Sequence, residues 1–305
     1  MKKILDYRLI WKTFNMSLYD FYQNTGARSL FRLKKWAGII EDDRDVDDKI
    51  YSMMTGFFHV NSARLLDYWI RYIDGNKVAN NEEERIMRNM LYYTFYKKNP
   101  AKCGFQSIDE GIESVLKETF VRDEVLQILK YNRKHISFVA GRNEYSYLCP
   151  LDLHCRYNTN QIMAAFGLFT ETESPEFREG VKRFEDKKTD IFFINLNKSE
   201  KDFSPSTMYE DYAINDKLFH WQSQSQDRQA SAKIQRYINH KNTGDIISLF
   251  VREFKRLGSY TAPYTFLGNA DYVKHEGERP VSFVWKLHNS IPADMLPKAN
   301  KSIAL

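Results

Sequence analysis

Polar and aromatic side chains suited to nucleic-acid contacts concentrate in three short stretches of the second half of this 305-residue chain. The first comprises residues 195–199 and 207–212, where an apolar run ends in Asn195, Asn197 and Lys198. A strand that ends in such residues presents hydrogen-bond donors at the rim of a sheet. A turn stabilised by its own side chains explains the same residues equally well.

The second stretch is Leu-Phe-His-Trp-Gln-Ser-Gln-Ser-Gln at residues 218–226. In a strand, alternate residues face opposite sides, so Trp221 would face one side and the polar residues the other. These polar residues are His220, Gln222 and Gln224. Glutamine can bond adenine with two hydrogen bonds, and tryptophan can stack on an exposed base. The alternative is a tryptophan that anchors the core beside outward-facing polar residues.

The third stretch joins residues 248–253 with 263–268. An apolar strand that ends in Arg252 can deliver a guanidinium group to phosphate or guanine. Tyr264 offers a stacking ring, and Gly268 allows close approach of backbone or ligand. The alternative is an Arg252 that pairs with a neighbouring acid.

Catalytic motifs are missing from the sequence. It has no Gly-x-x-x-x-Gly-Lys-Ser/Thr phosphate loop, no Gly-x-Gly-x-x-Gly turn, no Gly-x-Ser-x-Gly elbow and no His-Glu-x-x-His pair. A metal-dependent nuclease needs several carboxylates and usually a lysine, for which Glu210, Asp211 and Lys198 are the alternative candidates. We expect no catalytic set, no metal site and no cofactor, so this chain alone is not expected to be an enzyme.

Composition indicates a folded protein with a mildly basic balance. Lys and Arg number 45 against 40 Asp and Glu, a net charge of +5 that is compatible with a nucleic-acid partner. No stretch approaches the roughly 18 apolar residues of a membrane span, and the N-terminus has no signal-peptide pattern. Three cysteines form no disulfide framework, and the spacing of Cys149 and Cys155 does not fit zinc, so we expect a cytoplasmic protein.

Proline usage divides the chain, because Pro100 alone precedes residue 150 and seven prolines follow. Apolar spacing of three and four residues predicts helices in the first half, with Asn81 and Ser107 as helix starts. The predicted helices include 5–21, 29–38, 46–58, 62–73, 82–96, 108–119 and 122–132. We expect an N-terminal helical bundle at residues 1–143.

Residues 144–305 are rich in β-branched and aromatic residues with near-alternating spacing, which favours strands. Paired strands are predicted at 136–139 and 145–148 around Gly141, and helices at 161–166 and 227–239. Further strands are predicted at 180–184, 190–195, 217–222, 245–254, 264–273 and 280–288. The expected fold class is therefore α+β, with the helical bundle followed by a β-rich domain, either barrel-like or a strongly curved sheet, with a few helices.

The polar stretches also resemble a known family, the uncharacterised domain at the C-terminus of bacterial superfamily-2 (DEAD/DEAH-type) helicases. The segments that carry the resemblance are 153–157, 178–181, 195–198, 208–212, 219–224, 249–252 and 264–268. The resemblance implies that the chain is the C-terminal part of such a helicase, or its partner, in a restriction or phage-defence system. Residues 250–252 and 264–268 also resemble, more loosely, β-barrel modules that read DNA.

These observations lead to one preferred hypothesis, a non-catalytic DNA-recognition module. Its expected contacts are Asn197, Lys198, His220, Trp221, Gln222, Gln224, Arg252 and Tyr264. Its expected partners are DNA and a helicase or nuclease domain of the same system, without a membrane or a small-molecule cofactor. The alternatives are a metal-dependent nuclease and a protein-interaction platform of a defence complex.

Overall fold

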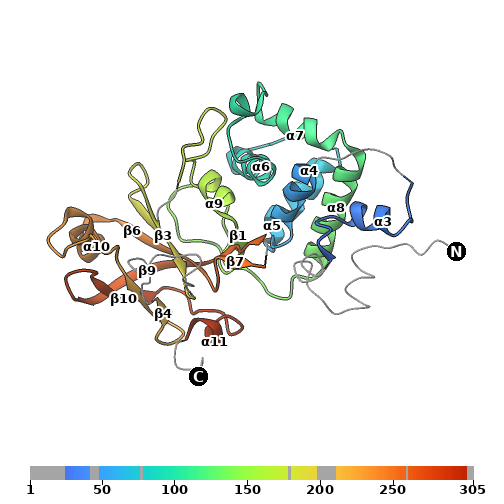
Figure 1. Cartoon of the computed structure of the whole chain (residues 1–305). Coiled ribbons are helices and arrows are strands. Elements are labelled where there is room, and N and C mark those ends of the chain that lie inside the picture. Colours follow the sequence, from blue (N-terminus) through green and yellow to red (C-terminus); the bar gives the residue numbers. More distant parts are fainter. Residues whose placement is uncertain are drawn as a thin grey trace.

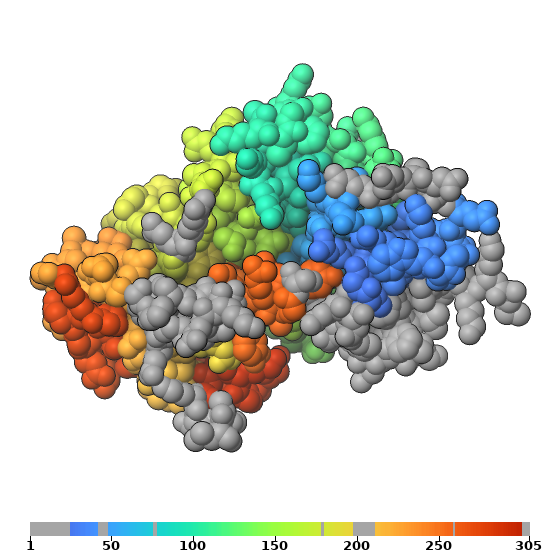
Figure 2. Space-filling view, viewed as in Figure 1, coloured from blue at the N-terminus to red at the C-terminus, as the bar shows by residue number. Residues whose placement is uncertain are grey.

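A computed structural model describes residues 25–41, 48–75, 78–177, 180–197, 211–258 and 260–300. In these residues the protein is a mixed α+β structure, with helices preceding a large mixed sheet (Figure 1). The space-filling view shows the two parts in contact along a broad junction (Figure 2). The helix predicted at 5–21 lies outside the described residues.

The described helices in the first half begin where local side chains cap them. Their bounds are α3 (Leu30–Trp36), α4 (Asp48–Met54), η1 (Thr55–Phe57), α5 (Ala63–Ile73), α6 (Glu82–Phe95), η2 (Pro100–Cys103), α7 (Ile108–Leu116) and α8 (Thr119–Lys134). The side-chain oxygens of Asn81 and Ser107 accept the backbone N–H groups of Glu84 and Glu110, as expected of N-caps. Both predicted helix starts are confirmed.

The helices pack on one another around Trp69 of α5. Its indole N–H donates to the Met87 carbonyl at 2.8 Å, and its ring meets Phe57 edge-on at 5.8 Å. Helix α6 also packs against α9 (Thr159–Ala165), which belongs to the second half of the sequence. One hydrophobic core therefore continues across the proposed boundary at residue 143 into the sheet, where Phe166 contacts Phe250.

The sheet has the strand order β2-β3-β6-β9-β10-β5-β4, and the short strand β1 pairs with β9. The bounds are β1 (Arg156–Tyr157), β2 (Val181–Phe184), β3 (Thr189–Asn195), β4 (Tyr212–Ala213), β5 (Leu218–Gln222), β6 (Ile246–Arg252), β9 (Tyr264–Glu276) and β10 (Ser282–Leu287). Strands β3 and β6 run parallel, whereas the other neighbours are antiparallel. A separate ribbon pairs β7 (Arg256–Leu257) with β8 (Tyr260–Thr261).

The sheet stays open, so the expectation of a barrel is corrected. In the described residues β2 and β4 lie at opposite ends of the strand order and do not pair. The sheet does not close on itself, and a helix covers part of one face. This helix, α10 (Ala232–Thr243), connects β5 to β6, and its Tyr237 packs on Phe192. Because β3 is buried on both faces, Phe193 joins the first core and Phe192 joins a second core.

The strands predicted at 136–139 and 145–148 are not formed, and the nearby pairing is a single bridge between Arg142 and Asp152. The alternating tyrosines pack instead: the Tyr145 and Tyr147 rings stack at 4.9 Å. The Tyr145 hydroxyl donates to Ser248 Oγ at 2.9 Å, which fastens this segment to the sheet. Alternation here reflects packing and not strand pairing. None of the described helices combines the length and apolar character needed to cross a membrane.

Candidate functional site

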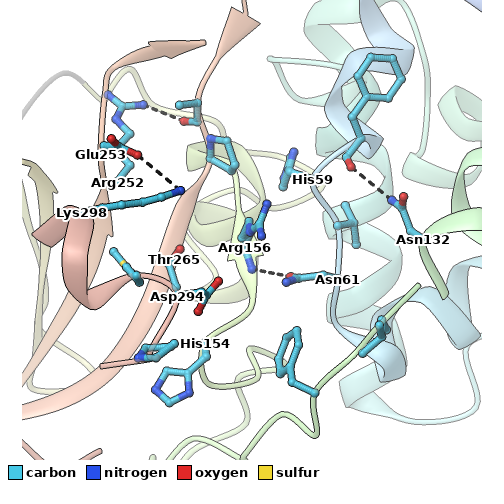
Figure 3. Close-up of a pocket in the computed structure, with 18 of the residues that line it drawn as sticks. His59, Asn61, Asn132, His154, Arg156, Arg252, Glu253, Thr265, Asp294 and Lys298 are labelled. Carbon is cyan, nitrogen blue, oxygen red and sulfur yellow. Dashed lines mark hydrogen bonds and ion pairs between the residues drawn. The ribbon is translucent and has the colours of Figure 1, made fainter. Parts of the chain in front are cut away.

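A cavity of about 570 Å³ lies where the rim of the sheet meets the helical half (Figure 3). The lining residues of one wall belong to the segments 58–61 and 132–139. Those of the other wall belong to the segments 252–257, 262–265 (without Tyr264) and 292–298, where the short helix α11 (Leu296–Ala299) begins. Arg156 lies between the walls in Figure 3, and His154 and Asp294 lie beside one another near the base of the view. The cavity thus draws on segments that are far apart in the sequence.

Arg156 is held at the junction through its backbone. Its N–H donates to Asn61 Oδ1 at 2.7 Å, and β1 pairs it with Thr265 of β9. The neighbouring His154 N–H donates to the Phe266 carbonyl at 2.8 Å. The Arg156 guanidinium, by contrast, makes no hydrogen bond or ion pair with any described residue. The backbone of Arg156 is therefore fixed at the cavity, while its guanidinium has no partner among the described residues.

Arg252 lines the same cavity but is engaged by its neighbours. Its Nε donates to Asn195 Oδ1 at 2.5 Å, and its Nη1 donates to the Ala262 carbonyl at 3.0 Å. Its guanidinium lies 4.2 Å from the Tyr264 ring centroid, in cation–π contact. With 8% of its surface exposed, Arg252 is part of the cavity wall.

The charged lining is slightly positive. Lys298 reaches Glu253 at 3.7 Å across solvent-exposed space, which is a weak ion pair. Arg156, Arg252 and Lys298 face two carboxylates, Glu253 and Asp294, which leaves one net positive charge when the lining histidines are neutral.

Two of these histidines stay neutral at pH 7 because burial disfavours their charged form. Burial lowers the pKa of His59 to about 4, and the Arg156 charge acts in the same direction. His59 Nε2 lies 3.0 Å from Gln161 Oε1, which only accepts, so this nitrogen carries the hydrogen. Burial also lowers the pKa of His154, against the opposing effect of Asp294. His154 Nε2 is buried without a hydrogen-bond partner among the described residues.

The cavity mouth carries exposed apolar side chains that sequence reasoning missed. Phe138 is 38% and Phe254 43% exposed, and Val139 is almost fully exposed. All three line the cavity. The sequence predicts a strand at 136–139, which contains Phe138 and Val139, and a strand at 245–254 that ends at Phe254. Their sequence pattern carries no signal that distinguishes a cavity mouth from a half-buried strand.

The residues expected from the sequence to contact nucleic acid fall into separate places. Arg252 and Tyr264 lie together at the rim. Asn197 is exposed just beyond β3, where its N–H donates to the Glu253 carbonyl at 2.8 Å. Lys198 lies outside the described residues.

The β5 residues lie at the other end of the sheet. Val251 pairs with Thr265 near the start of β9, whereas Gln222 pairs with Ser282, which pairs with Glu276 at the end of β9. At about 3.3 Å per residue, the two ends of β9 lie roughly 35 to 40 Å apart. The structure therefore does not bring Gln222 to the Arg252 rim, and its neighbours in β5 follow the same register.

The side chains of the 220–224 stretch have local partners. Trp221 is buried in the second core, 4.3 Å from the Phe192 ring centroid. The His220 ring stacks on Tyr212 at 4.7 Å. Gln224 Oε1 accepts from Lys233 Nζ at 2.9 Å. The tryptophan thus occupies the position expected of a core anchor.

Of the three alternative nuclease candidates, the structure describes one, Asp211. Asp211 is buried, and its carboxylate accepts the Gln222 N–H at 3.0 Å. Glu210 and Lys198 fall in the part of the chain that the structure does not describe. Within the described ranges, no cluster of three or more histidine, cysteine or acidic side chains is arranged to hold a metal ion.

The sheet-containing part of the chain matches a known protein family. Residues 151–298 match the family described as Domain of unknown function (DUF3427), so a domain of this uncharacterised family is present here. The match includes Arg156, Arg252 and Lys298, but not the cavity wall formed by residues 58–61 and 132–139. No curated protein shows a significant match to the chain.

Proposed function

We propose that this chain is a non-catalytic DNA-recognition module whose contact site is the cavity between the sheet rim and the helical half. The observation that carries the proposal is the Arg156 guanidinium, which lines the cavity and has no hydrogen-bond or ion-pair partner among the residues that the structure describes. Arginine presents a planar set of donors that matches a phosphate with two hydrogen bonds. Lys298 adds a second, half-exposed cation on the wall formed by the sheet rim and α11.

Arg156 and Arg252 have different roles in this proposal. Arg252 is bonded to Asn195 and Ala262 and stabilises the rim, while Arg156 remains available for a ligand. Holding the Arg156 backbone in advance reduces the entropy lost on binding.

A protein-interaction platform is the second candidate, supported by the exposed Phe138, Val139 and Phe254 at the mouth. Clusters of solvent-exposed apolar side chains often mark surfaces that bind another protein. Affinity for a protein that is insensitive to salt, without affinity for nucleic acid, would favour this candidate.

A helicase or nuclease domain as partner, and a role in restriction or phage defence, rest on the sequence resemblance alone. The resemblance is to domains at the C-terminus of helicases, so the proposed setting is a cytoplasmic DNA-processing complex. Co-purification of this chain with a helicase encoded beside it is the expected result, and its absence would remove this part of the proposal.

Fluorescence anisotropy with labelled duplex and single-stranded oligonucleotides at fixed salt tests the DNA proposal. Arg156→Ala is expected to weaken binding about tenfold, since it removes a charge-assisted hydrogen bond to phosphate. Arg122→Ala is the matched control, because Arg122 is exposed on α8 about 15 Å along the helix from Asn132. Equal affinities for the two variants, or no binding by the wild-type chain, would reject the proposal.

A further inference from the structure

We propose that the cavity receives one nucleotide at a time, with its base withdrawn from the base stack. The phosphate contacts Arg156 and Lys298, and the base lies between the apolar residues of the mouth. This inference rests on the proposed function and names the form of DNA that the site takes.

The size of the cavity selects a single nucleotide. Its volume of about 570 Å³ lies within the range of pockets that enclose one small ligand, roughly 300 to 1,000 Å³. A paired and stacked helix does not enter such a space, so a base must leave its stack to be bound there. An unpaired or mismatched base costs least to withdraw, and single strands offer their bases directly.

The apolar mouth supplies surfaces for a base. Phe138 comes from the segment after α8 and Phe254 from the segment after β6, so each side of the cavity contributes one phenylalanine. Both are more than one-third exposed. Every base has an aromatic face, and stacking on aromatic side chains holds bases with little regard to sequence. We therefore assign the two exposed rings to stacking against a base, since neither is buried in a hydrophobic core.

Two polar residues of the cavity lining, His154 and Asp294, are placed to meet the edge of the bound nucleotide's base. The buried His154 Nε2 has no partner among the described residues, and Asp294 makes no hydrogen bond or ion pair with them. Figure 3 shows Asp294 beside His154. A carboxylate accepts hydrogen bonds from the amino groups of cytosine and the other amino-bearing bases. Thymine has no such group and is therefore expected to bind less tightly.

The backbone of His154 is consistent with a binding role. Its φ of 65° lies in the left-handed region, which a residue with a side chain rarely adopts. The hydrogen bond from its N–H to the Phe266 carbonyl holds it there. Strained conformations of this kind cluster at ligand sites.

The carboxylates argue against an acidic peptide as the occupant. Its side chains would meet Glu253 and Asp294 in the same space. A nucleotide instead offers its single phosphate to the cations and its base donors to the carboxylates, which matches the mixed charge of the lining.

Three duplexes of equal charge test this inference: one fully paired, one with a single bulged cytosine and one with an abasic bulge. The bulged cytosine is expected to bind at least about fivefold more tightly than the abasic bulge, the effect of stacking one base. Phe138→Ala and Phe254→Ala should remove this difference, because each weakens the binding of the bulged cytosine by the loss of one stacking surface. Val273→Ala, an exposed apolar residue outside the cavity, is the control.

The outcomes separate the two proposals. Equal binding of all three duplexes would overturn the nucleotide inference and leave DNA recognition standing. Absence of binding to any of them would remove both. A bulged thymine that binds as well as bulged cytosine would overturn the assignment of Asp294.

Discussion

Arg252 and Tyr264 form a stacked pair at the adjoining ends of β6 and β9, with 4.2 Å between the guanidinium carbon and the ring centroid. The pair is buried, and the Arg252 charge opposes the effect of burial, which raises the pKa of Tyr264. Hydrogen bonds from Arg252 to Asn195 and Ala262 complete its surroundings. Two residues that we expected from the sequence to contact DNA separately therefore also stabilise each other.

Arg252→Ala is expected to lower the free energy of unfolding by about 2 to 4 kcal/mol, because it leaves buried hydrogen-bond acceptors without a donor. Tyr264→Phe keeps the ring and should cost less than about 1 kcal/mol. Urea unfolding followed by circular dichroism measures both. If Arg252→Ala unfolds like the wild type, the arginine is not structural.

Trp221 is expected to contribute to stability and not to nucleic-acid binding. Its ring packs on Phe192 and Phe283 in the second core. Trp221→Phe should lower stability by about 1 to 3 kcal/mol through lost contacts, with DNA affinity unchanged at a temperature where the variant is folded. A selective loss of affinity in a stable variant would restore the stacking role predicted from the sequence.

Gly268 is required by its contacts as well as by its backbone. Its φ is +88°, and an added Cβ would lie 2.7 Å from Leu153 Cδ2, next to His154. Gly244 also has a positive φ, of +71°, but faces open space. Gly244→Ala is expected to cost about 1 kcal/mol from backbone strain, and Gly268→Ala clearly more. Thermal unfolding of the two variants compares them, and equal costs would show that Leu153 yields without penalty.

His59 makes the protein less stable in mild acid. Its pKa is about 4 in the folded state, against 6.5 for an exposed histidine, so the unfolded chain binds more protons between these values. Stability from this group is complete above pH 6.5 and falls by about 3 kcal/mol as the pH drops to 4. His59→Gln should reduce this dependence in unfolding measurements at pH 7 and 4.5. An unchanged slope would contradict the burial of His59 as the cause.

Local features of the sequence predicted local structure well. The Asn81 and Ser107 caps act within one helical turn, so the sequence alone located α6 and α7. Long apolar runs likewise predicted β3 and β6. The length of β9 and its continued pairing with β10 were not visible in spacing, and neither was the open form of the sheet.

The site was harder to predict because distant segments build it. Arg252 was identified from its place at the end of an apolar strand, and it does line the cavity. Arg156 has no motif that distinguishes it from other arginines, and its importance follows from the contact between β1 and Asn61. Gln222 had a suggestive sequence pattern, but strand register places it at the other end of the sheet from Arg252.

The salt dependence of DNA affinity tests the central claim most directly, because each phosphate contact contributes to the slope of log K against log salt concentration. Arg156→Ala should make this slope shallower by about one unit, and Arg122→Ala should leave it as in the wild type. Identical slopes for the wild type and Arg156→Ala would contradict a phosphate contact at the cavity.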